Sequence, residues 1–121
     1  MFVPAEDTQA AISSAWEQLE ARFESLRGRK FFGAFDPISD EYRACVQVQP
    51  HDDPADLGLY EGVLPRGVYA RVRLRGEPPG IYGEIRRGFE QLEQCSSHDR
   101  SRPHIEFYRR HDEIDLLLPV V

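Results

Sequence analysis

The order of secondary-structure patterns starts over about halfway along the chain. The first half carries one helical pattern followed by two strand patterns, and the second half carries a strand pattern, a helical pattern and two closing strand patterns. In sequence order these patterns cover residues 8–26, 29–35 and 42–49, and then 68–75, 80–95, 102–110 and 114–121. A loop-rich connection, Pro50–Gly67, separates the halves. We therefore interpret the chain as a strand-helix-strand-strand unit used twice, with the first strand of the first copy missing or reduced to Phe2–Val3.

This order predicts an α+β fold. The 121 residues suffice for one domain with its own core, within which the pseudo-repeats cover about 1–49 and 67–121. Antiparallel strands would form one sheet with both helices on one face. Two related helices over one sheet would leave a groove between the halves where a ligand could bind.

Charge and composition exclude several functional classes. The net charge of −6 has the wrong sign for a nucleic-acid-binding surface, and acidic residues lie within a few positions of the arginine clusters at 71–75, 86–87 and 109–110. We therefore expect no direct nucleic-acid partner. Without an apolar run of membrane length or a signal-peptide pattern, we expect a cytoplasmic protein with no membrane partner. Cys45 and Cys95 are predicted to be free, buried thiols.

The sequence contains no recognisable metal or cofactor motif. Three of the four histidines precede an aspartate (His51, His98 and His111), all in predicted loops and without paired ligand spacing on one element. We interpret these histidines as solvent-exposed residues of turns and expect no bound metal. Residues 76–80 form a turn rather than a phosphate-binding loop, and no serine or cysteine has a recognisable base, so neither a cofactor nor a catalytic residue is assigned.

The carboxylate of Glu106 stands out among the strand residues. It lies in the middle of an aromatic and aliphatic strand pattern, on the same face as His104 and Tyr108, because side chains alternate along a strand. Burying a carboxylate there is costly unless a positive group compensates it. That group could be Arg71 or Arg109, which would make Glu106 an ordinary surface residue, or it could be a cationic ligand.

Five segments together resemble the GyrI-like small-molecule-binding domain, which is also the effector-binding domain of AraC-type and MerR-type multidrug regulators. They are Arg29–Pro37, Tyr42–Val46, Leu64–Ala70, Pro103–Tyr108 and Leu118–Val120. The resemblance runs from the first helix to Val121 and implies a pair of strand-helix-strand-strand (SHS2) modules. The chain departs from the family at its reduced first strand and has no helix-turn-helix segment, so we expect a stand-alone binding domain rather than a DNA-binding regulator.

The resemblance implies a groove for bulky, often cationic aromatic compounds. Glu106 matches the family's groove glutamate, and Tyr108 matches the tyrosine that follows it. The candidate ligand-binding residues are Glu106, Tyr108, Trp16, Tyr69, Tyr42 and Phe35. Trp16 could equally be core packing on the apolar stripe of the first helix, and Tyr108 a core or rim aromatic.

Three functions remain open at this point. The first is a drug-sensing or sequestering module that binds hydrophobic or cationic aromatic molecules. The second is a hydrolase of cyclopropane-bearing genotoxins, in which Glu106 and Tyr108 would position and activate water. The third is a protein-interaction role with a regulator or as a modulator of DNA gyrase.

Overall fold

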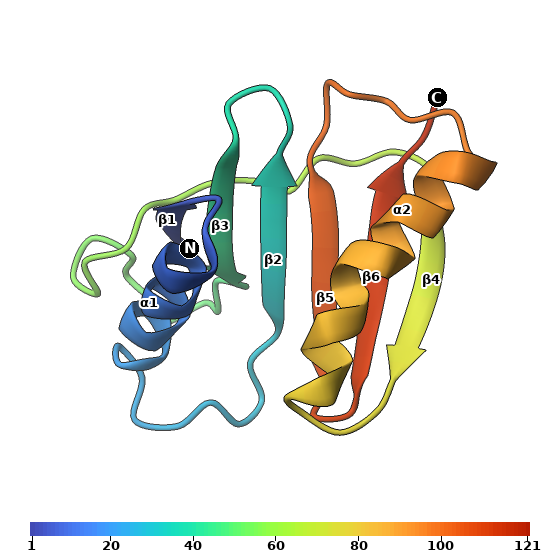
Figure 1. The fold of residues 1–121 in the computed structure, drawn as a ribbon. Coiled ribbons are helices and arrows are strands. Elements are labelled where there is room, and N and C mark those ends of the chain that lie inside the picture. The colour runs from blue at the N-terminus through green and yellow to red at the C-terminus, as the bar shows by residue number, and fades with distance from the viewer.

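The computed structural model describes residues 1–121 as an α+β protein with six strands and two α-helices (Figure 1). In chain order the elements are β1 Phe2–Glu6, α1 Gln9–Glu20, β2 Phe31–Asp36, β3 Glu41–Val46, β4 Tyr69–Arg75, the short 3₁₀ helix η1 Gly80–Glu84, α2 Ile85–Cys95, β5 His104–Arg110 and β6 Glu113–Pro119. The α+β class predicted from the sequence is therefore confirmed.

The six strands form one antiparallel sheet in the order β1-β3-β2-β5-β6-β4. Each half contributes three adjacent strands. In each half the strand that comes last in the sequence, β3 or β6, lies between the other two. The halves meet through the pairing of β2 with β5, in which Gly33 lies opposite Glu106. This central pairing makes the sheet continuous.

Both helices cover the same face of the sheet (Figure 1). The register places Ala44, Gly33, Glu106 and Leu116 opposite one another in a row across β3, β2, β5 and β6. Directly opposed residues share a face. Ala44 belongs to the apolar cluster under α1, and Leu116 to the cluster under α2. The side of the sheet that carries this row of residues is therefore the side covered by the helices, and we call it the helix face.

The core is divided between the two halves. The first cluster joins Ala15 and Leu19 of α1 to β3 residues such as Tyr42 and Val46. The second joins Leu92 of α2 to the β6 residues Ile114, Leu116 and Leu118 and to Ile81 of η1. Thus α1 packs on β1 and β3 while α2 packs on β4 and β6, and β2 and β5 lie between the two helices (Figure 1).

The first strand is complete, contrary to the expectation that it is missing or reduced. β1 pairs with β3 along its whole length, from Phe2 opposite Cys45 to Glu6 opposite Glu41. The Phe2 ring stacks on Tyr60 at 5.7 Å between centroids and lies under the Arg43 guanidinium. These contacts come from the connection and from β3, so local sequence pattern could not reveal them. The chain itself supplies the outer strand of the first half.

The first helix ends at Glu20, six residues earlier than the predicted boundary at 26. The reason is a set of tertiary contacts made by residues 23–29. Phe23 lies beneath the Arg29 guanidinium, 4.2 Å from the ring centroid, and Arg29 forms a two-pronged ion pair with Asp52 at 2.7 and 2.8 Å. These contacts favour an irregular segment over another helical turn.

The second helix also differs from its predicted range of 80–95, because its first five residues form the 3₁₀ helix η1. Two glycines, Gly80 and Gly83, lie in this stretch directly after Pro78-Pro79, and both residue types disfavour regular α-helix. Ile81 nevertheless keeps its place in the core.

The face opposite the helices carries the connection between the halves and many of the charges. Leu64 of the connection packs on a small cluster formed by Phe2, Ala34 and Cys45. Farther along the sheet, Arg73 and Arg75 of β4 lie opposite Asp115 and Glu113 of β6 and pair with them. The arginines of β4 are therefore largely neutralised by acidic partners.

Two further sequence expectations can be compared with the structure. Both cysteines are free, but only Cys45 is buried, and Cys95 at the end of α2 is exposed, contrary to prediction. Neither α-helix has the length and apolar character needed to cross a lipid bilayer.

Candidate functional site

A partly buried carboxylate, Glu106, lies on the helix face at the central pairing of the sheet. Its Oε1 atom accepts two hydrogen bonds from phenols, one from Tyr42 at 2.8 Å and one from Tyr108 at 2.6 Å. Tyr42 comes from β3 and Tyr108 from β5, the strand that carries Glu106. The two strands lie on either side of β2, so Tyr42 reaches across β2 to Glu106.

Gly33 of β2 makes this reach possible. It lies opposite Glu106 on one side and opposite Ala44 on the other. A Cβ atom at position 33 would overlap both the Tyr42 hydroxyl and Glu106 Oε1. The absence of a side chain here leaves the space in which carboxylate and phenol meet.

Aromatic rings from both halves surround the carboxylate. The Trp16 indole of α1 donates its Nε1–H to the Tyr42 hydroxyl, with 3.1 Å between nitrogen and oxygen. Its ring lies edge-on to the Tyr108 ring, with 5.2 Å between the ring centroids. From the other half, Tyr82 of η1 approaches Tyr108 at 6.5 Å and is half exposed. We call Glu106, Tyr42, Tyr108 and Trp16 the Glu106 site.

Glu106 has no positively charged side chain as a partner. Arg109 pairs instead with Glu113 at 2.8 Å, and Arg71 lies 4.0 Å from Asp115. Neither of the two arginines considered from the sequence therefore neutralises Glu106. Its second oxygen, Oε2, accepts no hydrogen bond from the protein and is not one of the sealed, unpartnered polar atoms of the molecule. Oε2 therefore keeps its hydrogen-bonding capacity unused within the protein.

Burial shifts the pKa values of all three acidic groups in the site. Desolvation raises the pKa of Glu106, an effect that the hydrogen bonds from Tyr108 and Tyr42 oppose. Desolvation, together with the neighbouring carboxylate, raises the pKa values of Tyr42 and Tyr108 far above the ordinary value. Both phenols therefore remain protonated hydrogen-bond donors at neutral pH.

Of the six predicted binding residues, the structure brings four together in the Glu106 site. Phe35 lies on the same face but next to His104, at 5.9 Å between ring centroids. Tyr69 lies elsewhere, since it is opposite Pro119 and its neighbour Ala70 lies opposite Leu118 of the helix-face core. Its hydroxyl donates to the Pro65 carbonyl and its ring lies beneath Arg102. Tyr69 is therefore a structural residue of the opposite face rather than part of this site.

Sequence reasoning missed two residues that adjoin the Glu106 site, Gly33 and Tyr82. A glycine inside a strand pattern is a known sign of close approach by another group, and this signal could have drawn attention to Gly33. Tyr82 is spaced three and seven residues from Ile85 and Phe89, so helical periodicity places it beside the apolar stripe, but periodicity does not specify its contact with Tyr108 on β5.

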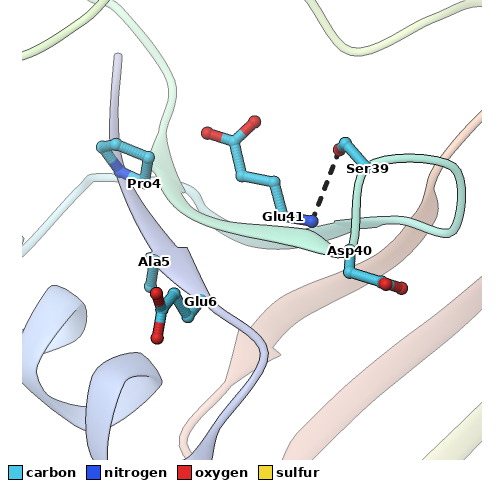
Figure 2. A pocket seen from close by; sticks show the side chains of 6 residues that line it. All are labelled: Pro4, Ala5, Glu6, Ser39, Asp40 and Glu41. Atoms are coloured by element: carbon cyan, nitrogen blue, oxygen red, sulfur yellow. Dashed lines mark hydrogen bonds between the residues drawn. The ribbon is translucent and has the colours of Figure 1, made fainter.

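A surface pocket lies elsewhere, at the edge of the sheet (Figure 2). It is lined by Pro4, Ala5 and Glu6 of β1 and by Ser39, Asp40 and Glu41 at the β2–β3 turn. Three of these six residues are acidic and none is aromatic, so the pocket lacks apolar walls for an organic ligand. The Glu106 site remains the stronger candidate on chemical grounds.

Comparison with known proteins adds no identification: no protein-family model, no curated protein and no solved structure matches the chain. The functional argument therefore rests on the geometry of the Glu106 site.

Proposed function

We propose that the protein binds hydrophobic, cationic aromatic molecules at the Glu106 site, as a GyrI-like module that senses or sequesters them. The observation that carries the proposal is a carboxylate with no cationic partner, one oxygen held by two phenols and the other free of protein hydrogen bonds. A positive charge close to a desolvated carboxylate favours its ionised form. In this chain the cation would come from the ligand.

The surroundings of Glu106 favour an aromatic cation over a small inorganic one. The faces of tryptophan and tyrosine rings attract cations, and the attraction grows when the site is desolvated. Trp16 from α1 and Tyr82 from η1 both approach Tyr108, so rings are available from each half. A weakly hydrated aromatic cation could contact a ring face and the carboxylate together, which a strongly hydrated metal ion could not.

The architecture also supports the comparison with paired SHS2 modules. The strand order β1-β3-β2-β5-β6-β4 reads the same from either edge when β1, β2 and β3 are matched to β4, β5 and β6. The helices pack on the outer strands, and Glu106 lies on the central pairing between them. We propose that a groove between the helices admits the ligand to Glu106.

The test uses three probes of similar shape and different charge. Tetraphenylphosphonium is cationic, triphenylphosphine oxide is neutral and tetraphenylborate is anionic. Glu106→Gln should weaken binding of the cation by about 10–100-fold, because a charge-assisted contact contributes roughly 1.5–3 kcal/mol. The substitution should leave the affinity for the neutral probe nearly unchanged and raise the affinity for the anion. Calorimetry measures affinity, and Trp16 fluorescence reports occupation of the site.

Glu90→Gln is the matched control, because Glu90 is an exposed residue of α2 and the change in net charge is identical. If both variants weaken binding of the cation equally, the net charge of the protein rather than the Glu106 site governs binding. If Glu106→Gln weakens binding of all three probes to the same extent, Glu106 shapes the site without recognising charge. Unchanged affinity for the cation would place the binding site elsewhere.

A further inference from the structure

Three potential metal ligands, none of them part of the Glu106 site, come together at the end of α2. They are Glu93 of α2, His98 of the loop that follows, and His104, the first residue of β5. One ligand atom from each lies within 4.8 Å of the other two. His104 Nε2 and Glu93 Oε1 are 3.0 Å apart. The sequence interpretation placed His98 in a solvated turn, whereas in the structure it is partly buried beside His104.

Two ring nitrogens in this cluster are buried without a hydrogen-bond partner. They are His98 Nε2 and His104 Nδ1, and no other side-chain nitrogen or oxygen in the protein is sealed from solvent in this way. The His104 side chain is nine-tenths buried, in contact with the rings of Phe35 and Phe89. Buried polar atoms almost always have hydrogen-bond partners, so each of these two nitrogens lacks a partner that its burial calls for. Glu93 does not supply one to His104 Nδ1, because its carboxylate contacts Nε2 of that ring.

The backbone holds His98 in place on both sides. The Asp99 amide donates to the Pro119 carbonyl at 2.9 Å, and the Val121 amide donates to the Ser97 carbonyl at 2.9 Å. His98 itself forms a β-bridge with Val120. His104 is fixed in a central strand, whereas the Glu93 side chain is half exposed and can adjust. Two ligands are therefore prepositioned and the third is adaptable.

We propose that Glu93, His98 and His104 form a binding site for a divalent transition metal of the Zn²⁺ class. Imidazole nitrogens and one carboxylate are a common donor set for Zn²⁺. Ligand atoms at 2.0–2.1 Å from a tetrahedral ion lie about 3.3 Å apart, so closure needs only a shift of about 1.5 Å by the most distant pair. Three protein ligands leave a fourth position for water.

This site goes beyond the proposed function and shares no residue with the Glu106 site. Both lie on the helix face of β5, since His104 and Glu106 are two residues apart, about 7 Å along the strand. The metal would link the end of α2, the following loop and β5. Its binding should therefore also raise resistance to unfolding.

The experiment titrates the chelator-treated full chain with Zn²⁺ against a chromophoric competitor. The wild type should bind one ion per chain. His98→Ala should weaken binding by at least about tenfold, because even groups outside the ligand shell are often worth 10–100-fold in metal affinity. Glu93→Gln, at an exposed position of α2, should weaken Zn²⁺ binding as well. With Co²⁺ added, the wild type should show the visible absorption of a tetrahedral site, and His98→Ala should not.

Two variants serve as controls. His111→Ala removes a histidine from an exposed pair with Glu77 that has no third ligand. Cys95→Ser removes the exposed thiol two residues from Glu93. Both should bind Zn²⁺ like the wild type. The proposal is overturned if the wild type binds no Zn²⁺ saturably, if Cys95→Ser abolishes binding, or if His98→Ala and Glu93→Gln both bind as tightly as His111→Ala.

Discussion

At the scale of single residues, Gly33 controls the space around the carboxylate. Gly33→Ala would force the Tyr42 hydroxyl and Glu106 Oε1 to move, because the new methyl group would overlap both atoms. We expect a loss of about 1–3 kcal/mol in the free energy of unfolding, the usual cost of overpacking a close-packed site. Binding of tetraphenylphosphonium should weaken in parallel. Urea unfolding and calorimetry measure the two effects.

The matched variant is Gly80→Ala, since an added methyl group at position 80 would meet no atom within 4 Å. It should change neither stability nor binding appreciably. If Gly33→Ala behaves like Gly80→Ala in both measurements, the contact between Tyr42 and Glu106 does not constrain the site.

Individual site residues were partly predictable from sequence. The alternation of side chains along a strand places Glu106 and Tyr108 on one face, and the register confirms this. The partner Tyr42 lies 64 positions away from Glu106, and the hydrogen bond depends on two strand pairings that no local pattern specifies. For the same reason the approach of His98 to His104 was missed.

At the scale of secondary-structure elements, the pairing of β4 with β6 makes stability depend on pH. The hydrogen-bonded Arg73 guanidinium holds the pKa of Asp115 below its ordinary value, despite burial of the carboxylate. A carboxylate with a depressed pKa in the folded state contributes stability above its unfolded pKa and loses it as the pH falls. The wild type should therefore lose stability progressively below about pH 5.

Asp115→Asn removes this contribution, so its stability should lie well below that of the wild type at pH 7, and the difference should shrink towards pH 3. Urea unfolding at several pH values measures it. Glu90→Gln breaks an exposed pair with Arg86 and should have little effect at any pH. A stability difference for Asp115→Asn that is the same at pH 7 and pH 3 would exclude titration of Asp115 as the cause.

The boundaries of elements were less predictable than their existence. Periodicity alone extends the first helix through Phe23 and Leu26, but the contact of Phe23 with Arg29 and the Arg29–Asp52 ion pair favour a different backbone path. β1 was underestimated because its evidence lies in its pairing with β3 rather than in its own five residues. Tertiary contacts decided both cases.

At the scale of the whole molecule, two separate apolar clusters share one sheet. We expect them to unfold together, because the central pairing of β2 with β5 joins them through a hydrogen-bonded ladder. Leu19→Ala and Leu116→Ala, each at a fully buried position, should each cost about 2–5 kcal/mol in stability. Trp16 is the only tryptophan and reports on the first half, whereas far-ultraviolet circular dichroism reports on both.

Coincident transitions by the two probes, in the wild type and in both variants, are the expected result. Leu116→Ala is the informative variant, since its cavity lies in the half that lacks tryptophan. If Trp16 fluorescence still reports the wild-type midpoint in Leu116→Ala, the two halves unfold independently.

The overall architecture was the most predictable level. Alternation and helical periodicity give the order of strands and helices in each half, and the α+β class follows from that order. The order of strands in the sheet depends on hydrogen bonds between segments far apart in the chain, so local sequence patterns could not predict it. The pairing of Gly33 with Glu106 is the clearest example.

The central pairing also has a consequence for the chain while it is being synthesised. Residues 31–36 of β2 emerge from the ribosome long before residues 104–110 of β5, and the Phe-Phe-Gly-Ala-Phe run meanwhile presents an unpaired, uncharged edge. Such edges readily pair with another chain. A nascent or truncated chain that ends before β5 would therefore meet its greatest risk of aggregation at the strand that later forms the centre of the finished protein.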